Sequence, residues 1–133
     1  MSSEPLPPPE FFLERSLGKL TAEGLLAHGW IVHTISEHFP DDGADTSDED
    51  WIEFGVSRGW TCLTKDKRIR YRAAEIEALT SGHIFCLADG NLQVDAMVER
   101  FASAVNAIHS GIAQYEVGFW HVYARGRVKK MWP

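Results

Sequence analysis

Four short apolar runs alternate with segments of helical character, and this alternation limits the fold of the chain more than any other feature. The runs span residues 11–13, 30–35, 60–63 and 83–87 and are rich in aromatic and β-branched side chains, as buried strands usually are. Strands that alternate with helices generally form a mostly parallel sheet with helices on both faces. The sequence therefore predicts an α/β fold.

Two helices are indicated in the first half of the chain. Ser16 can cap a helix that ends near Gly29, because serine is a preferred N-cap residue. The expected apolar face of this helix consists of Leu17, Leu20, Leu25 and Leu26. A second helix is predicted to begin at Ser47 or Asp48 and to bury one face that contains Trp51, Ile52 and Gly55.

The second half of the chain shows two further helical segments and a hairpin. Residues 73–79 indicate a short helix, and apolar residues at helical spacing over 92–108 predict one longer amphipathic helix that covers the sheet. The aromatic tail, residues 119–132, is typical of a β-hairpin that turns at Arg125 and Gly126. We therefore expect a parallel sheet that ends in a C-terminal hairpin.

The overall composition is that of a globular chain with one core. A length of 133 residues suits a single domain, which we predict to span residues 10–133 after a flexible proline-rich leader at residues 1–9. Neither a signal peptide nor a membrane helix is indicated, so the expected location is cytoplasmic and no membrane partner is expected. Cys62 and Cys86 lie within apolar runs, where buried thiols are the usual state.

Acidic side chains follow two of the predicted strands and open one predicted helix. Glu14 and Asp66 come directly after strands, while Asp48, Glu49 and Asp50 begin the second helix. Carboxylates gathered at the carboxyl edge of a sheet repel one another unless a cation lies between them. An all-oxygen site suits Mg²⁺ or Mn²⁺, which can activate water for phosphodiester cleavage. Acids in a first helical turn are also favoured by the helix dipole alone.

Basic side chains cluster next to the strand-end acid although the net charge of the chain is −6. Any contact with nucleic acid must therefore be a local patch. Arg68, Arg70 and Arg72 would share one side of an extended segment and could bind phosphates there, whereas in a helix they would point in different directions. The cations predicted to contact nucleic acid are Arg15, Lys65, Arg68, Arg70 and Arg72.

The remaining candidates carry weaker signals. The six histidines show no recognisable pair spacing for a metal, so a zinc site is not expected. His38, beside the acidic stretch, could act as an acid or contact a substrate, but the role of a plain loop residue is favoured. Trp120, Tyr123 and Trp132 in the tail could stack on bases, but aromatic side chains in a hairpin more often pack on the sheet or on a partner subunit. The tail is therefore where we expect contacts of a homodimer.

Three segments of the chain resemble a known family. They are residues 11–18 with the sequence FFLERSLG, residues 38–51 with HFP and DEDW, and residues 64–72 with TKDKRIRYR. In order and spacing over roughly residues 10–90 they are similar to the PIN-like domains related to VapC-type toxins. The resemblance implies a three-layer α/β/α sandwich and a Mg²⁺- or Mn²⁺-dependent endoribonuclease, usually paired with an antitoxin protein.

The same resemblance implies roles for particular residues. Glu14, Asp66 and one of Asp48, Glu49 and Asp50 match the acids that hold the metal, and we assign the catalytic roles to Glu14, Asp48 and Asp66. Two positions depart from the family pattern, because the first acid is usually Asp and many relatives carry a further acid where this chain has Arg68. A PIN-like module that no longer cleaves but still binds RNA or a protein partner is the alternative hypothesis.

Overall fold

The computed structural model describes residues 9–133, apart from the side chains of residues 42 and 73–75. The proline-rich leader predicted for residues 1–9 lies outside the described residues, except for Pro9. The division of the chain into this leader and one domain of residues 10–133 stays a prediction.

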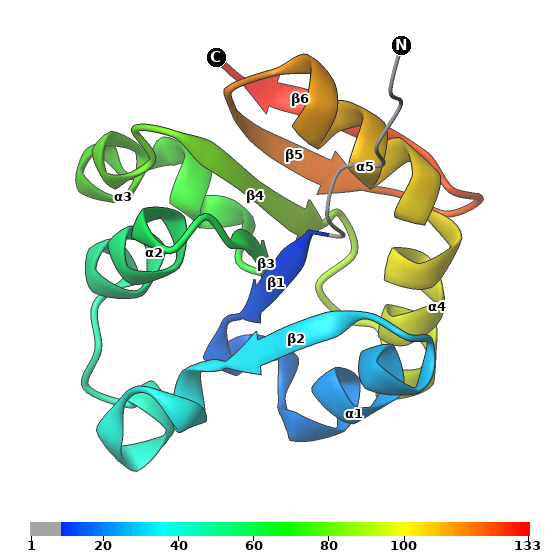
Figure 1. Ribbon diagram of the computed structural model, residues 1–133, viewed down its shortest axis with the longest axis horizontal. Helices are drawn as coiled ribbons and strands as arrows, with labels where there is room; N and C mark the ends of the chain where they lie inside the picture. The colour runs from blue at the N-terminus through cyan, green and yellow to red at the C-terminus, as the bar shows by residue number, and fades with distance from the viewer. Residues whose placement is uncertain (1–8) are drawn as a thin grey trace, which may run out of the picture.

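The described residues form one six-stranded sheet with the strand order β2-β1-β3-β4-β5-β6 (Figure 1). The strands are β1 (Glu10–Leu13), β2 (Ile31–Thr34), β3 (Thr61–Thr64), β4 (Gly82–Leu87), β5 (Val117–Val122) and β6 (Val128–Trp132). The first five are parallel to their neighbours, and only β6 pairs antiparallel, with β5. The predicted mostly parallel sheet is thereby confirmed.

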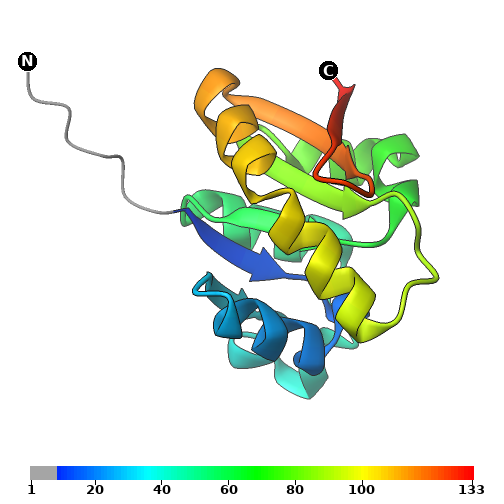
Figure 2. The same ribbon diagram turned by 90° about the vertical axis from the view of Figure 1, so that its right-hand side faces the viewer.

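Helices cover both faces of this sheet, which gives the predicted three-layer sandwich (Figures 1 and 2). One face carries α1 (Lys19–Ala27), α4 (Val94–Ser103) and α5 (Val105–Gln114), and the other carries α2 (Asp48–Ser57) and α3 (Ala73–Ala78). Four 3₁₀ turns connect these elements: η1 (Arg15–Leu17), η2 (Ile35–Glu37), η3 (Pro40–Gly43) and η4 (Lys67–Tyr71). No helix among the described residues is long and apolar enough to cross a membrane.

The core has two halves, one on each side of the sheet, and β1 contributes to both. Phe11 and Leu13 pack in the half under α1, α4 and α5, whereas Phe12 packs in the half under α2 and α3. This division follows from the alternation of side chains along a strand. Cys62 and Cys86 are buried and free, as predicted, and burial raises the pKa of each thiol to about 12.

Helix α2 contacts the sheet through a glycine. A Cβ atom at Gly55 would lie 2.9 Å from the Phe12 ring and 3.0 Å from the Cys62 Sγ atom, well inside van der Waals contact. Trp51 and Ile52 are buried on the same side of the helix. The predicted packing face of α2 is therefore confirmed, and Gly55 sets its distance from β1 and β3.

The predicted apolar face of the first helix is only half right. Leu17 and Leu25 are buried, but Leu20 is 61% and Leu26 54% exposed. Helix α1 contacts α4, and Gly24 lies against Val98 so closely that a Cβ atom there would be 2.5 Å from a methyl carbon. The stripe that faces the core is therefore narrow, and leucines outside it point to solvent.

The single long helix predicted over residues 92–108 is also wrong, because the helix is interrupted at Ala104. The Ala104 amide donates to the Phe101 carbonyl, three residues back rather than four, and its φ and ψ of −93° and 4° depart from those of an α-helix. The β5-β6 turn packs against this break. A Cβ atom at Gly126 would lie 2.7 Å from the Ser103 carbonyl oxygen.

The predicted C-terminal hairpin is confirmed, with its turn at the expected residues. Arg125 and Gly126 have φ values of 63° and 71°, and positive φ at both central positions is the mark of the type I′ turn that matches strand twist. The pairing continues from Val122 opposite Val128 to Phe119 opposite Trp132.

We predict that Gly126→Ala destabilises the fold more than Gly59→Ala. Both glycines have positive φ, 71° and 76°, so each alanine incurs a backbone strain of about 1–2 kcal/mol. Only at Gly126 would the added methyl meet the Ser103 carbonyl, since nothing lies within 4 Å of a Cβ atom at Gly59. Urea unfolding should show an additional loss of about 1–3 kcal/mol for Gly126→Ala. Equal losses would contradict the close contact.

Candidate functional site

Glu14 and Asp66 lie just beyond the carboxyl ends of two adjacent parallel strands. Glu14 follows β1, and its amide donates to the Leu63 carbonyl of β3 at 3.0 Å. Its carboxylate accepts a hydrogen bond from the Ser16 amide at 2.6 Å, which caps η1. Asp66 follows β3, and its Oδ1 atom accepts from the Arg68 amide at 3.0 Å, which caps η4. Both carboxylates are therefore held by amides two residues ahead.

Asp48 enters the same region from the first turn of α2. The helix is capped by Ser47, whose hydroxyl accepts from the Asp50 amide at 3.2 Å, as the sequence predicted. Asp48 Oδ1 accepts from the indole N–H of buried Trp51 at 2.7 Å. Asp48 Oδ2 accepts from Arg72 Nη1 at 2.7 Å. Glu49 and Asp50 are exposed.

These three acids act on one another electrostatically. Burial raises the pKa of the Glu14 carboxyl, and the negative charges of Asp48 and Asp66 raise it further, against the hydrogen bonds from Ser16 that lower it. Glu14 and Asp66 also line one open hollow together with Ser16, Lys65, Lys67, Arg68 and Gly90. The structure thus brings Glu14, Asp48 and Asp66 to one edge of the sheet.

Arginine side chains already lie between the acids. Arg72 Nη1 is 2.7 Å from Asp48 Oδ2 and 3.4 Å from Asp66 Oδ2, so one guanidinium bridges both carboxylates. Arg68 Nε lies 3.0 Å from Asp66 Oδ1. Burial works to raise the pKa of Asp66, but the hydrogen bonds from Arg68 and the charges of Arg68 and Arg72 outweigh it, and the pKa is lowered. Asp66 is therefore held as a carboxylate.

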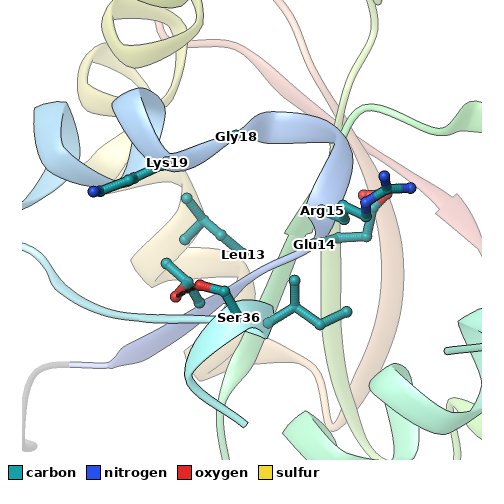
Figure 3. A pocket seen from close by; sticks show the side chains of 8 residues that line it. Leu13, Glu14, Arg15, Gly18, Lys19 and Ser36 are labelled. Carbon is teal, nitrogen blue, oxygen red and sulfur yellow. Dashed lines mark hydrogen bonds between the residues drawn. The ribbon is translucent and has the colours of Figure 1, made fainter. Parts of the chain in front are cut away.

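The remaining predicted RNA contacts are spread around this region. Residues 67–71 form a 3₁₀ turn, so the helical alternative is the one observed. Arg68 and Arg72 nevertheless both contact the Asp66 carboxylate. Arg70 donates to the Tyr71 hydroxyl at 2.9 Å. Lys65 lines the open hollow that also contains Glu14 and Asp66. Arg15 lines a neighbouring small pocket (Figure 3).

Figure 3 shows this neighbouring pocket beside the end of β1. Glu14 and Arg15 lie at the turn that follows the strand, and Lys19 and Ser36 lie across the pocket from them. Glu14 therefore lines both this pocket and the open hollow that it shares with Asp66.

Sequence reasoning missed two hydrogen-bond donors that position the acids, one a backbone amide and one an indole. Ser16 donates its amide to Glu14, and Trp51 donates its indole N–H to Asp48. The spacing could have indicated both. The backbone amide two residues after a strand-end acid can close a capping turn, and a residue three positions after a helix-start acid lies on the same face.

A model of the PIN-like domain family matches residues 9–89, which is more than half of the chain. The chain belongs to the PIN-like domain family. The matched segment begins just before β1 and ends just after β4, so it contains all three acids of the site. PIN-like domains are often nucleases. A search of curated proteins and a search of solved structures each gave no match.

We predict that Glu14→Gln gains stability over the wild-type protein as the pH rises, when a chelator is present. The folded-state pKa of Glu14 is raised above its ordinary value of 4.5, so its deprotonation opposes folding as the pH rises through that pKa. Glutamine retains an acceptor for the Ser16 amide without the charge. The melting temperatures of both proteins, measured from about pH 4 to pH 8, should diverge with increasing pH.

Glu23→Gln, at an exposed position of α1, is the matched control and should show no such divergence. A difference between Glu14→Gln and wild type that stays constant across the pH range would contradict the raised pKa.

Proposed function

We propose that this PIN-like protein is a divalent-metal-dependent endoribonuclease that cleaves RNA by means of an activated water molecule. The observation that supports the proposal best is the convergence of Glu14, Asp48 and Asp66 at the carboxyl edge of the parallel sheet, within a segment that matches the family. Ligands of α/β sheets bind in the crevice beyond this edge.

The donor set fits Mg²⁺ or Mn²⁺. Three carboxylates from separate parts of the chain supply the oxygen ligands that these hard cations prefer. A cationic nitrogen of Arg72 already lies between Asp48 and Asp66, so the site stabilises positive charge at that position. When bound, the metal would polarise the scissile phosphate and lower the pKa of the attacking water.

Each acid has a distinct part in this proposal. Asp66 is ionised by its arginine partners and is ready to bind a cation. Glu14, with its raised pKa, is the acid whose charge most needs a cation for compensation. Asp48 is the proposed ligand from α2, since it shares Arg72 with Asp66. Exposed Glu49 and Asp50 assist through their charge.

The proposed substrate is RNA, held through its phosphates by the surrounding cations. Lys65 and Arg68 line the hollow next to Glu14 and Asp66, and Arg15 lines the adjoining pocket. The side chain of Arg68 is 77% exposed, so it can contact a phosphate while it remains beside Asp66. Arg70 and Arg72 are the further cations that we propose to contact the RNA backbone. Guanidinium groups suit phosphate because they can donate two parallel hydrogen bonds.

The wider biological role that we propose is that of a toxin related to the VapC type, acting in the cytoplasm and held inactive by an antitoxin protein. The C-terminal hairpin, β5 and β6, is the surface where we place homodimer contacts. Both proposals extend the ribonuclease assignment and depend on it.

A catalytically impaired module that binds RNA or a protein partner is the second candidate. The observation in its favour is that the carboxylates of Asp48 and Asp66 already have arginine partners, and that Arg68 stands where many relatives carry an acid. The longer side chain at Glu14 is the other departure. If that length alone limits activity, Glu14→Asp should increase cleavage.

We expect Asp66→Asn to abolish Mn²⁺-dependent cleavage of RNA by the purified protein. Loss of a carboxylate ligand should lower the rate by at least about 100-fold, since even outer-shell substitutions cost 10–100-fold. A labelled structured RNA in a gel assay with Mn²⁺ measures this. Asp95→Asn, on α4 and exposed, is the control that should retain full activity. The proposed nuclease activity would be refuted if Asp66→Asn still cleaves RNA, or if the wild-type protein does not cleave it.

We further expect Arg72→Gln to bind Mn²⁺ more tightly than wild type, because the arginine competes with the metal for Asp48 and Asp66. Removal of a partly exposed ion pair should increase the affinity by up to about tenfold. Calorimetric titration measures it, with Arg127→Gln, on the exposed hairpin, as the control. Weaker metal binding by Arg72→Gln would show that Arg72 supports the site instead.

A further inference from the structure

A second group of metal-type side chains lies at the edge of the sheet, and it includes none of the three acids discussed above. His33 belongs to β2, Glu37 ends η2, and His38 follows directly. One ligand atom from each lies within 4.8 Å of the other two. The sequence showed no recognisable histidine pair here, but the 3₁₀ turn folds His38 back towards His33.

His33 is held in place by two contacts. Its ring stacks on Trp60 at 3.8 Å between centroids, with an angle of 9° between the planes. Its Nε2 atom lies 2.9 Å from Glu10 Oε1. A carboxylate next to one ring nitrogen fixes the tautomer and the orientation of the imidazole, as is usual around metal-binding histidines. The Glu10 carboxylate therefore supports His33 in the way that an outer-shell group supports a ligand.

The other two side chains are also positioned. The His38 ring packs among aromatic rings, with its centroid 5.0 Å from that of Phe54 and 5.5 Å from that of Trp60. Glu37 Oε1 accepts from the Thr34 amide at 3.2 Å and lies 3.0 Å from the Thr34 hydroxyl, so the carboxylate is held against the end of β2. Little reorganisation is thus needed to bring the three donors together.

We propose that His33, Glu37 and His38 form a binding site for a divalent transition metal of the zinc class. Two imidazole nitrogens and one carboxylate oxygen suit Zn²⁺, Co²⁺ or Ni²⁺, whereas Mg²⁺ prefers oxygen ligands alone. The site is thereby chemically distinct from the all-carboxylate site proposed for Mg²⁺ or Mn²⁺. This inference does not depend on the nuclease proposal.

The proposed ion would connect the edge strand to the loop that follows it. His33 lies in β2, while Glu37 and His38 open the connection that leads to the N-cap of α2 at Ser47. A metal bound there restricts the start of that connection, and free energy of metal binding adds to that of folding. We therefore expect the metal to stabilise the fold.

Titration of the full-length, chelator-treated protein with Co²⁺ alone tests the site. Co²⁺ bound by two histidines gives visible absorption, which Zn²⁺ should abolish by displacement. We expect one ion per chain, and at least about a tenfold loss of affinity in each of His33→Gln, Glu37→Gln and His38→Gln. His109→Gln, at an exposed position of α5, is the matched control and should bind as wild type does.

Trp60 gives a second readout at the same place. Because it stacks on His33, bound Co²⁺ should quench its fluorescence, and Trp60→Phe should remove most of that quenching while the absorption titration remains. Glu37 and His38 are exposed, so their substitutions should leave the fold intact, which circular dichroism checks.

Two results would overturn the proposal. The first is the absence of saturable Co²⁺ binding by wild type, or unchanged binding by folded Glu37→Gln and His38→Gln. The second is loss of Co²⁺ binding in Asp66→Asn, which would place the ion among the strand-end acids. Retention of Co²⁺ binding by Asp66→Asn, whatever happens to its RNA cleavage, supports a separate site.

Discussion

The parallel pairing of β1 with β3 is the constraint on which the candidate site depends. Leu13 lies opposite Leu63 in this pairing, and the Glu14 amide continues the ladder by donating to the Leu63 carbonyl. Because the two strands run in the same direction and end almost level, the residues that follow them leave the sheet at one edge. A shift of one residue in this register would send one of the two carboxylates to the opposite side.

Much of this arrangement could be predicted from the sequence, since it depends on local signals. Apolar runs bounded by glycine and charge located the strands, and strand-end positions located Glu14 and Asp66. Ser47 capped the helix that carries Asp48, and the dipeptide Arg125-Gly126 located the hairpin turn. In each case neighbours in the chain determine the outcome, through strand burial, capping or turn geometry.

The rest depends on contacts between distant segments, which no local pattern contains. Leu26 is apolar, as core residues usually are, but it is exposed because only a narrow face of α1 packs against the rest of the protein. The helix interruption at Ala104 coincides with the close approach of a hairpin turn more than twenty residues later. Arg72 bridges Asp48 and Asp66. This contact could not be predicted locally, because Asp48 lies at the start of α2 and Asp66 lies after β3. Tertiary packing decided all three.

The glycine near the C-terminal end of α2 has a consequence for the site, although it lies two helical turns away from Asp48. Because Gly55 has no side chain, α2 packs directly on Phe12 and Cys62. Asp48 belongs to the same helix, so its position follows that of the helix. A side chain at this position would collide with Phe12 and Cys62, so the helix would have to move away from the sheet and Asp48 would move with it. The position of Asp48 relative to the other two carboxylates therefore depends on a residue without a side chain, seven positions further along the helix.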